Sequence, residues 1–183
     1  MPDALTDHDL VAGVHAEPDL FARVYRALAP AVLGYFGARG VEDPEALMQD
    51  VFLSVLPRLG DITGGVAGLR TLLFSVAHAR VVDYYRRVER RPQSVDYDPL
   101  LDMRAVPSAE TEALVRNGQT DAHLLIGALK PEQRDVLMLR IVGELSIDDV
   151  ATVLGKTPGA VKQLQRRGLK ALREMVSEGV MAE

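Results

Sequence analysis

The chain has 183 residues, enough for one domain or two small ones. Because it contains no cysteine, a disulfide framework, a cysteine-ligated zinc site and a thiol nucleophile are excluded. The net charge of −5 is distributed unevenly, with residues 70–91 and 121–176 each net positive and the intervening segments net negative. Since phosphate binding depends on the local field more than on total charge, this pattern allows two separate nucleic-acid contacts on an acidic protein.

The first third of the chain has the periodicity of amphipathic helices. Aliphatic side chains dominate and aromatic residues are only 5% of the chain, which favours packed helices over a β-sandwich. Apolar residues at intervals of four predict a helix over residues 19–38. Asp43 and Pro44, a capping residue followed by proline, start a second helix that reaches about residue 59. A short turn or helix is expected near residues 10–14.

A loop at residues 60–65 precedes a longer predicted helix over residues 66–90. Its last turns are rich in arginine, which also suits the negative end of the helix dipole. Its inward face consists of apolar side chains at helical spacing, namely Leu69, Leu72, Leu73, Val76, Ala77 and Val81.

The character of the chain changes at residues 92–109, where prolines frame a stretch that contains Asp96, Asp98 and Asp102. We interpret this segment as a flexible acidic linker that spans roughly 55 Å when extended. An ordered loop packed on one domain is the alternative. After it, the sequence predicts helices over residues 110–129, 131–142, 147–154 and 158–176.

The last two of these helices form a predicted helix-turn-helix. Ser146 is placed to cap the first helix, with Asp149 three residues later completing an S-x-x-D capping box. Gly155 stands where the turn requires a positive φ. Thr157 caps the second helix, and Pro158 occupies its first turn, where a missing N–H costs nothing.

The outward face of that second helix is basic, and no acidic residue lies between Thr157 and Arg173. It carries side chains of the kinds that contact phosphates and base edges in a major groove: Lys162, Gln163, Arg166, Arg167 and Lys170. The pattern favours DNA binding. An amphipathic hairpin whose polar face only meets water is the alternative.

Taken together, residues 18–176 resemble a bacterial extracytoplasmic-function (ECF) sigma factor of the sigma-70 family, a specificity subunit of RNA polymerase. The segment PEALMQDVFLSVLPRL is similar to the D-L-x-Q-E-x-F-L motif of sigma region 2. By this resemblance Gln49 and Asp50 bind the core polymerase. The chain departs from the family pattern at Ala46, where aspartate is common, and at Leu56, where tryptophan is common.

The segment LRTLLFSVAHARVVDYYRRVERRP resembles the long helix of sigma regions 2.3 and 2.4, which opens the −10 element. Leu72 and Ala79 replace a usual tryptophan and a frequent asparagine. The polar side chains that the resemblance assigns to −10 DNA are His78, Arg80, Asp83, Tyr84, Arg86 and Arg87.

The C-terminal helices resemble sigma region 4, with GKTPGAVKQLQRRGLKAL similar to the helix that recognises the −35 element. The resemblance assigns base and phosphate contacts to Lys162, Gln163, Arg166 and Arg167. Gln163 suits adenine and either arginine suits guanine. The start of this helix, at Thr157, suits a phosphate through the helix dipole.

These observations predict an all-α protein of two small helical domains. We assign residues 1–91 to region 2, 92–109 to the linker, 110–176 to region 4 and 177–183 to a tail. The expected function is a sigma factor that binds core RNA polymerase and directs initiation at promoter DNA through −10 and −35 elements. The resemblance also implies an anti-sigma factor as a partner.

Two other classes of function remain open at this stage. One is a helix-turn-helix regulator that acts without polymerase, and the other is a helical interaction protein without DNA affinity. An enzyme is not expected, because the chain has no phosphate-binding loop and its histidines are far apart. We expect no metal, no cofactor and no membrane span, and a cytoplasmic location.

Overall fold

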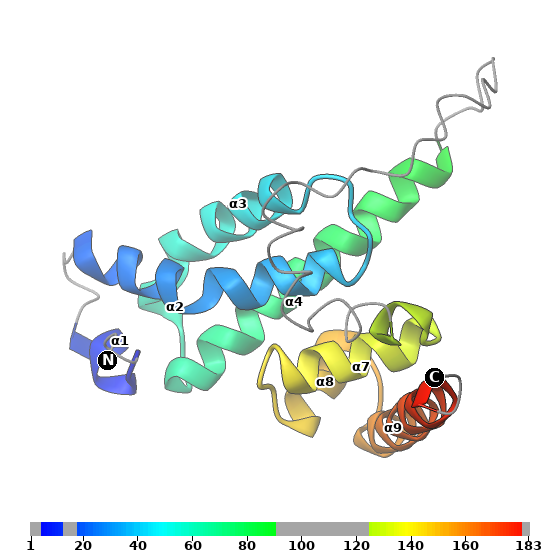
Figure 1. Cartoon of the computed structure of the whole chain (residues 1–183). Coiled ribbons are helices and arrows are strands. Elements are labelled where there is room, and N and C mark those ends of the chain that lie inside the picture. Colours follow the sequence, from blue (N-terminus) through cyan, green and yellow to red (C-terminus); the bar gives the residue numbers. More distant parts are fainter. Residues whose placement is uncertain (1–4, 13–17, 91–124, 181–183) are drawn as a thin grey trace, which may run out of the picture.

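The computed structural model describes residues 5–12, 18–90 and 125–180, and all its regular elements in these ranges are helical. Figure 1 shows them: α1 (Asp7–Ala12), α2 (Pro18–Gly37), α3 (Pro44–Val55), the 3₁₀ helix η2 (Leu56–Asp61), α4 (Gly65–Arg90), α7 (Pro131–Ile141), α8 (Ile147–Leu154) and α9 (Pro158–Val180). The all-α prediction is therefore confirmed. The predicted linker and most of the predicted helix at residues 110–129 lie outside the described residues.

The first bundle consists of α2, α3 and α4, which pack against one another. The predicted start of α3 is confirmed, since Asp43 Oδ1 accepts a hydrogen bond of 2.9 Å from the Ala46 N–H. The predicted end was wrong, because α3 stops at Val55 and continues as the 3₁₀ helix η2. Pro57, which cannot donate a backbone hydrogen bond, explains the change of helix type.

The short helix α1 is tied to this bundle by two aspartates. Asp7 Oδ1 accepts a hydrogen bond of 2.7 Å from the Val66 N–H and so caps α4 from a distant part of the sequence. Asp9 lies 2.8 Å from the guanidinium of Arg23 on α2. Hydrogen bonds from Thr6, followed by that from Arg23, lower the pKa of Asp9 to about 2. The position of α1 thus supports the start of the longest helix.

The second bundle consists of α7, α8 and α9 and contains the predicted helix-turn-helix. The capping box is confirmed, with reciprocal hydrogen bonds between Ser146 and Asp149. Gly155 ends α8 in the left-handed conformation with φ 61°. α9 crosses α7 closely at Gly168, where a Cβ atom would lie 2.9 Å from Leu137 Cδ1. The turn and the crossing together set the direction of α9.

The two bundles pack against each other through α8 and α4, as Figure 1 shows. Their buried side chains form one continuous hydrophobic cluster that extends from α1 to the start of α9. Phe74 of α4 lies within this cluster and is fully buried. The relative placement of the bundles is therefore part of the core and not a loose contact.

Among the described residues, α4 is the helix that is long and apolar enough to be compared with a membrane span. An 18-residue window of this helix has a mean hydropathy of 1.2, enough by length and composition to cross a bilayer. However, α4 contacts α1, α2, α3 and α8, as a core helix of a bundle does. The hydropathy of α4 is weak support for a membrane span.

Candidate nucleic-acid interface

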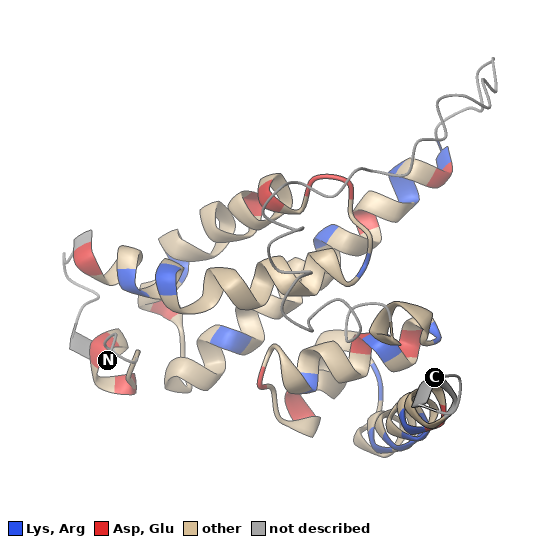
Figure 2. Ribbon diagram, in the orientation of Figure 1, with Lys and Arg blue, Asp and Glu red and all other residues tan. Residues whose placement is uncertain are grey.

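The exposed face of α9 carries several lysine and arginine residues, and Figure 2 shows the basic positions as blue segments along this helix. Val161 is fully buried and anchors the opposite side of the helix. Among the described residues, Lys170 pairs with Glu174 at 3.4 Å, and the other outward cations have no ion pair. All five predicted contact residues are exposed on this helix: Lys162, Gln163, Arg166, Arg167 and Lys170.

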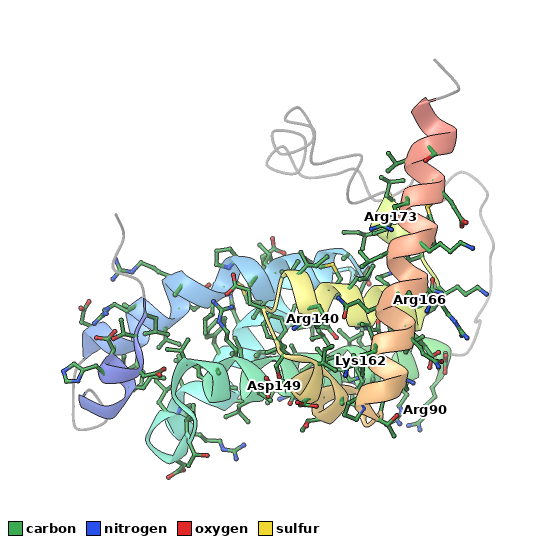
Figure 3. All side chains as sticks on the ribbon, turned by 90° about the horizontal axis from the view of Figure 1, so that it is seen from below. Arg90, Arg140, Asp149, Lys162, Arg166 and Arg173 are labelled. Atoms are coloured by element: carbon green, nitrogen blue, oxygen red, sulfur yellow. The ribbon has the colours of Figure 1, made fainter. Side chains whose placement is uncertain are left out.

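A shallow groove of about 280 Å³ runs along α9 beside this face. Figure 3 shows three of its basic residues, Lys162, Arg166 and Arg173, spaced along the helix. Gln165 and Leu169 complete the described lining. Sequence reasoning did not include Gln165 or Arg173 among the contacts. Their spacing from Lys162 and Arg166 along one side of a helix was the available signal.

The N-terminus of α9 is held in a defined geometry. Thr157 Oγ1 accepts a hydrogen bond of 3.2 Å from the Ala160 N–H, which confirms the predicted cap. Lys156 Nζ, in the preceding turn, donates a hydrogen bond of 2.6 Å to Glu132 on α7. That hydrogen bond and the positive charge of Lys156 lower the pKa of Glu132. The turn is therefore fixed to α7, and the first turn of α9 faces outward.

The six residues predicted to contact −10 DNA differ in their surroundings on α4. Arg80 Nη2 donates a hydrogen bond of 3.2 Å to Ser54 Oγ on α3. Tyr84 Oη accepts one of 3.3 Å from the Glu42 N–H in the turn before α3. Asp83 and Arg86 form an exposed ion pair of 3.7 Å. Among the six, Arg86 and Arg87 are the exposed cations at the end of the helix.

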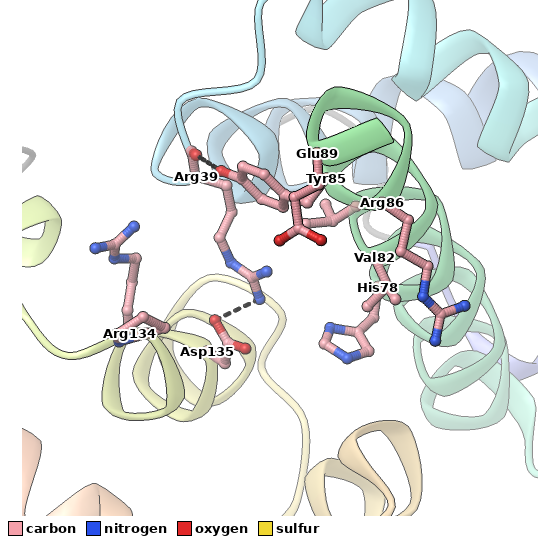
Figure 4. Close-up of a pocket in the computed structure, with 10 residues that line it drawn as sticks. Arg39, His78, Val82, Tyr85, Arg86, Glu89, Arg134 and Asp135 are labelled. Carbon is pink, nitrogen blue, oxygen red and sulfur yellow. Dashed lines mark hydrogen bonds and ion pairs between the residues drawn. The ribbon is translucent and has the colours of Figure 1, made fainter. Parts of the chain in front are cut away.

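His78 faces the second bundle. Its Nδ1 lies 3.0 Å from Tyr35 Oη, and burial followed by the charge of Arg39 lowers the pKa of His78 to about 4. It lines a cavity of about 530 Å³ between α4 and α7, where Figure 4 shows it near Arg39 and Asp135. In this arrangement the imidazole is neutral at pH 7 and directed away from the exposed end of α4. Its assignment to DNA stays a prediction.

The residues predicted to bind core polymerase lie on the outer face of α3. Gln49 and Asp50 are both exposed. Leu53, one turn further along, has 72% of its surface exposed. Sequence reasoning did not include Leu53 in this site. The available signal was that Leu53 falls outside the apolar stripe that packs α3 into the bundle. Leu53 therefore lies on the same exposed side of α3 as Gln49 and Asp50.

Comparison with known proteins identifies the family of this chain. A family model described as Sigma-70, region 4 matches residues 120–172. The chain is 30% identical over 180 residues to the ECF RNA polymerase sigma factor ShbA of Streptomyces griseus, covering 96% of this chain and 90% of the relative. The chain belongs to the ECF RNA polymerase sigma factors.

A second relative of this sigma factor is the ECF RNA polymerase sigma factor BldN of Streptomyces coelicolor, with 28% identity over 165 residues. The alignment covers 88% of this chain and 62% of that relative, so the sigma factor spans less than two thirds of the length of BldN. Among solved structures, CnrH in complex with the cytosolic domain of CnrY matches with a TM-score of 0.64 and 19% identity, covering 94% of this chain and 97% of that one. This last likeness concerns the fold.

Proposed function

We propose that this sigma factor binds core RNA polymerase and directs transcription initiation at promoters that contain a −35 and a −10 element. The observation that carries the proposal is the exposed, basic face of α9 on a helix-turn-helix whose two caps are formed. Membership of the ECF sigma factors supports the polymerase as the partner.

In the proposed complex, α9 lies in the major groove of the −35 element. Gln163 reads adenine, and Arg166 or Arg167 reads guanine through two parallel hydrogen bonds. Lys162 and Lys170 contact phosphates. The capped N-terminus at Thr157 binds a further phosphate, because the helix dipole and the N–H groups of the first turn favour an anion there.

The outer face of α3 is the proposed polymerase-binding site. Asp50 and Gln49 supply polar contacts, and Leu53 supplies apolar surface next to them. The 72% exposure of Leu53 supports this assignment, because binding would remove that surface from water. Ser54, by contrast, is engaged with Arg80 within the bundle.

The −10 element is assigned to α4. Arg86 and Arg87 are exposed and suited to the DNA backbone. Tyr84 offers an aromatic ring for stacking on an unpaired base. His78 and Arg80 reach DNA in this proposal only after their present contacts with Tyr35 and Ser54 are released.

We further propose that residues 1–91 and 110–176 act as two weak DNA-binding units. Joining them by the linker at residues 92–109 makes the second contact effectively intramolecular, so that specificity depends on both elements. This function places the protein in the cytoplasm and gives this chain no catalytic step. An anti-sigma factor is a further proposed partner, as the family resemblance implies.

The experiment that tests the proposal compares two full-length variants. We expect Asp50→Ala to weaken binding to core polymerase by at least tenfold. Arg167→Ala should leave core binding unchanged and lower transcription from a promoter selected with the wild-type holoenzyme. Core affinity is measured by titration of labelled sigma factor, and transcription by run-off synthesis. If both variants lost only DNA affinity, a regulator that acts without polymerase would replace the proposal.

A further inference from the structure

The first turn of α4 is capped by a residue that is far away in the sequence. The Gly68 N–H donates a hydrogen bond of 3.1 Å to the Gly64 carbonyl, so the helix begins directly after Gly64. Gly64 has no side chain that could accept a hydrogen bond from the free N–H groups of this turn. The Val66 N–H instead donates a hydrogen bond of 2.7 Å to Asp7 Oδ1 on α1. Asp7 therefore supplies the cap that the neighbouring residue lacks.

The backbone at the start of α4 leaves room for the Asp7 carboxylate. Gly64 and Gly65 both have a positive φ, of 83° and 61°. A Cβ atom on Gly65 would overlap the carboxylate of Asp7. An alanine at this position would therefore displace the cap as well as strain the backbone. The two consecutive glycines thus permit the close contact between α1 and the first turn of α4.

The helix α1 is itself fixed in place, so the Asp7 carboxylate is held at a defined position. Asp9 accepts hydrogen bonds of 2.7 Å from the N–H and the Oγ1 of Thr6, and it lies 2.8 Å from Arg23 Nη2 on α2. Leu10 is buried in the hydrophobic core. α1 also contacts η2 and α4, and Figure 1 shows it beside the start of α4. The short helix therefore connects α2 with the junction between η2 and α4.

A shallow pocket of about 210 Å³ lies at the same junction. Its described lining comes from η2, from the loop after it and from α4, and consists of Arg58, Asp61, Ile62, Thr63, Gly68 and Leu72. A Cβ atom on Gly68 would overlap the carbonyl oxygen of Thr63, so the loop and the helix are in close contact. The surface that α4 presents at this end therefore depends on how its first turn is held.

We propose that Asp7 is a positioning residue for the −10 contact of this sigma factor. By capping α4, it holds the first turn of the helix and the loop before it in the geometry that opens promoter DNA. The inference rests on the proposed function, in which α4 contacts the −10 element. Asp7 acts through the Val66 N–H and does not itself contact DNA. Because the cap needs only an acceptor oxygen, asparagine should replace the aspartate, whereas alanine should not.

Amide hydrogen exchange at Val66 tests the cap in the full-length protein without polymerase. We expect Asp7→Ala to speed the exchange of this N–H by at least about fivefold, because its acceptor is lost. Asp7→Asn should keep the exchange rate within about twofold of the wild type. Asp19→Ala is the matched control, since Asp19 lies on α2 and forms an exposed ion pair of 3.7 Å with Arg26. Equal exchange rates in Asp7→Ala and Asp19→Ala would overturn the cap.

Promoter opening by the holoenzyme tests the positioning role. A fluorescent base analogue in the −10 element, on a promoter selected with the wild-type holoenzyme, reports the unpairing of bases. We expect Asp7→Ala to lower the rate of opening by at least about fivefold, and Asp7→Asn to keep it within about twofold of the wild type. The affinities for core polymerase and for −35 DNA should stay within about twofold of the wild type in both variants, because Asp7 shares no partner with those sites. Unchanged opening in Asp7→Ala, or an equal loss of all three activities, would overturn the proposal.

The wild-type protein in the same experiment separates the inference from the proposed function. If it neither binds core polymerase nor opens the promoter, the proposed function is wrong and the positioning role is overturned with it. If it does both, and Asp7→Ala opens the promoter equally fast, the proposed function stands and the role of Asp7 alone is wrong.

Discussion

The two basic helices of this sigma factor, α4 and α9, use their charged residues in different ways. On α9, Lys162, Arg166 and Arg167 are exposed and have no ion pair among the described residues. On α4, Arg70 is bonded to the second bundle and Arg80 to α3. A basic residue on α9 is therefore available to a ligand, whereas Arg70 and Arg80 on α4 already stabilise the tertiary structure.

This difference follows from the place of each helix in the fold. α4 contacts α1, α2, α3 and α8. α9 contacts α7 and α8 on one side and leaves the other to solvent. Counting cations along a helix therefore counts exposed side chains on α9, whereas on α4 it includes Arg70 and Arg80, which are bonded within the fold.

The largest expected effect comes from the inward side of α4. Phe74 is fully buried, its ring packs edge-on against Tyr35 at 5.6 Å, and it contributes to the core that joins the bundles. Phe74→Ala should lower the free energy of unfolding by about 3–5 kcal/mol, measured by chemical denaturation. Leu53→Ala, at an exposed position, should change it by no more than about 0.5 kcal/mol. Similar losses for both variants would contradict this description of the core.

The next comparison distinguishes an arginine that binds DNA from an arginine that stabilises the fold. Arg166→Ala on α9 should weaken binding to −35 DNA by about 1–3 kcal/mol and leave stability unchanged. Arg80→Ala on α4 should lower stability by about 1 kcal/mol, because Ser54 loses its hydrogen-bond donor. DNA binding is measured by fluorescence anisotropy and stability by thermal melting. If Arg166→Ala lost as much stability as Arg80→Ala, the cations of α9 and α4 would not differ in their structural roles.

A smaller effect concerns the turn that directs α9. Gly155 has φ 61°, and a Cβ atom there would meet nothing within 4 Å. The cost of Gly155→Ala is therefore conformational, about 1 kcal/mol of unfolding free energy. Gly155→Asn should cost less, because asparagine tolerates the left-handed region. Equal losses for alanine and asparagine would indicate that packing, and not φ, determines the cost.

A further expected effect is a pH dependence from His78. Its pKa is about 4 in the folded protein against an ordinary value of 6.5, so the unfolded chain binds more protons between these values. The free energy of unfolding should fall as the pH drops from 6.5 towards 4. Burial raises the pKa of Asp135, which acts in the opposite direction. The other ionisable groups that line the cavity are Arg39, Tyr85, Arg86, Glu89 and Arg134.

The variant His78→Gln isolates the contribution of the imidazole, since it keeps a polar side chain without the titration. We expect the fall in stability between pH 6.5 and 5, measured by urea denaturation, to be smaller in this variant than in the wild type. An identical pH profile for both proteins would show that His78 is not held neutral by burial.

Interactions between residues that are close in sequence account for what could be predicted about the second bundle. The capping box at Ser146, the left-handed Gly155 and the cap at Thr157 depend on residues within a few positions of one another, so sequence spacing identifies them. The same holds for the exposed face of α9, where an uninterrupted helical period separates Val161 from the basic residues.

The sequence by itself determined the helices, most of their boundaries, the helix-turn-helix and the family. Only the tertiary structure decided that Arg39 pairs with Asp135, that His78 faces the second bundle and that Leu53 remains exposed. The reason is how far apart in the sequence the interacting residues lie. Caps and helical periods join residues within one or two turns, whereas a buried ion pair between residues far apart in sequence exists only once the helices have packed.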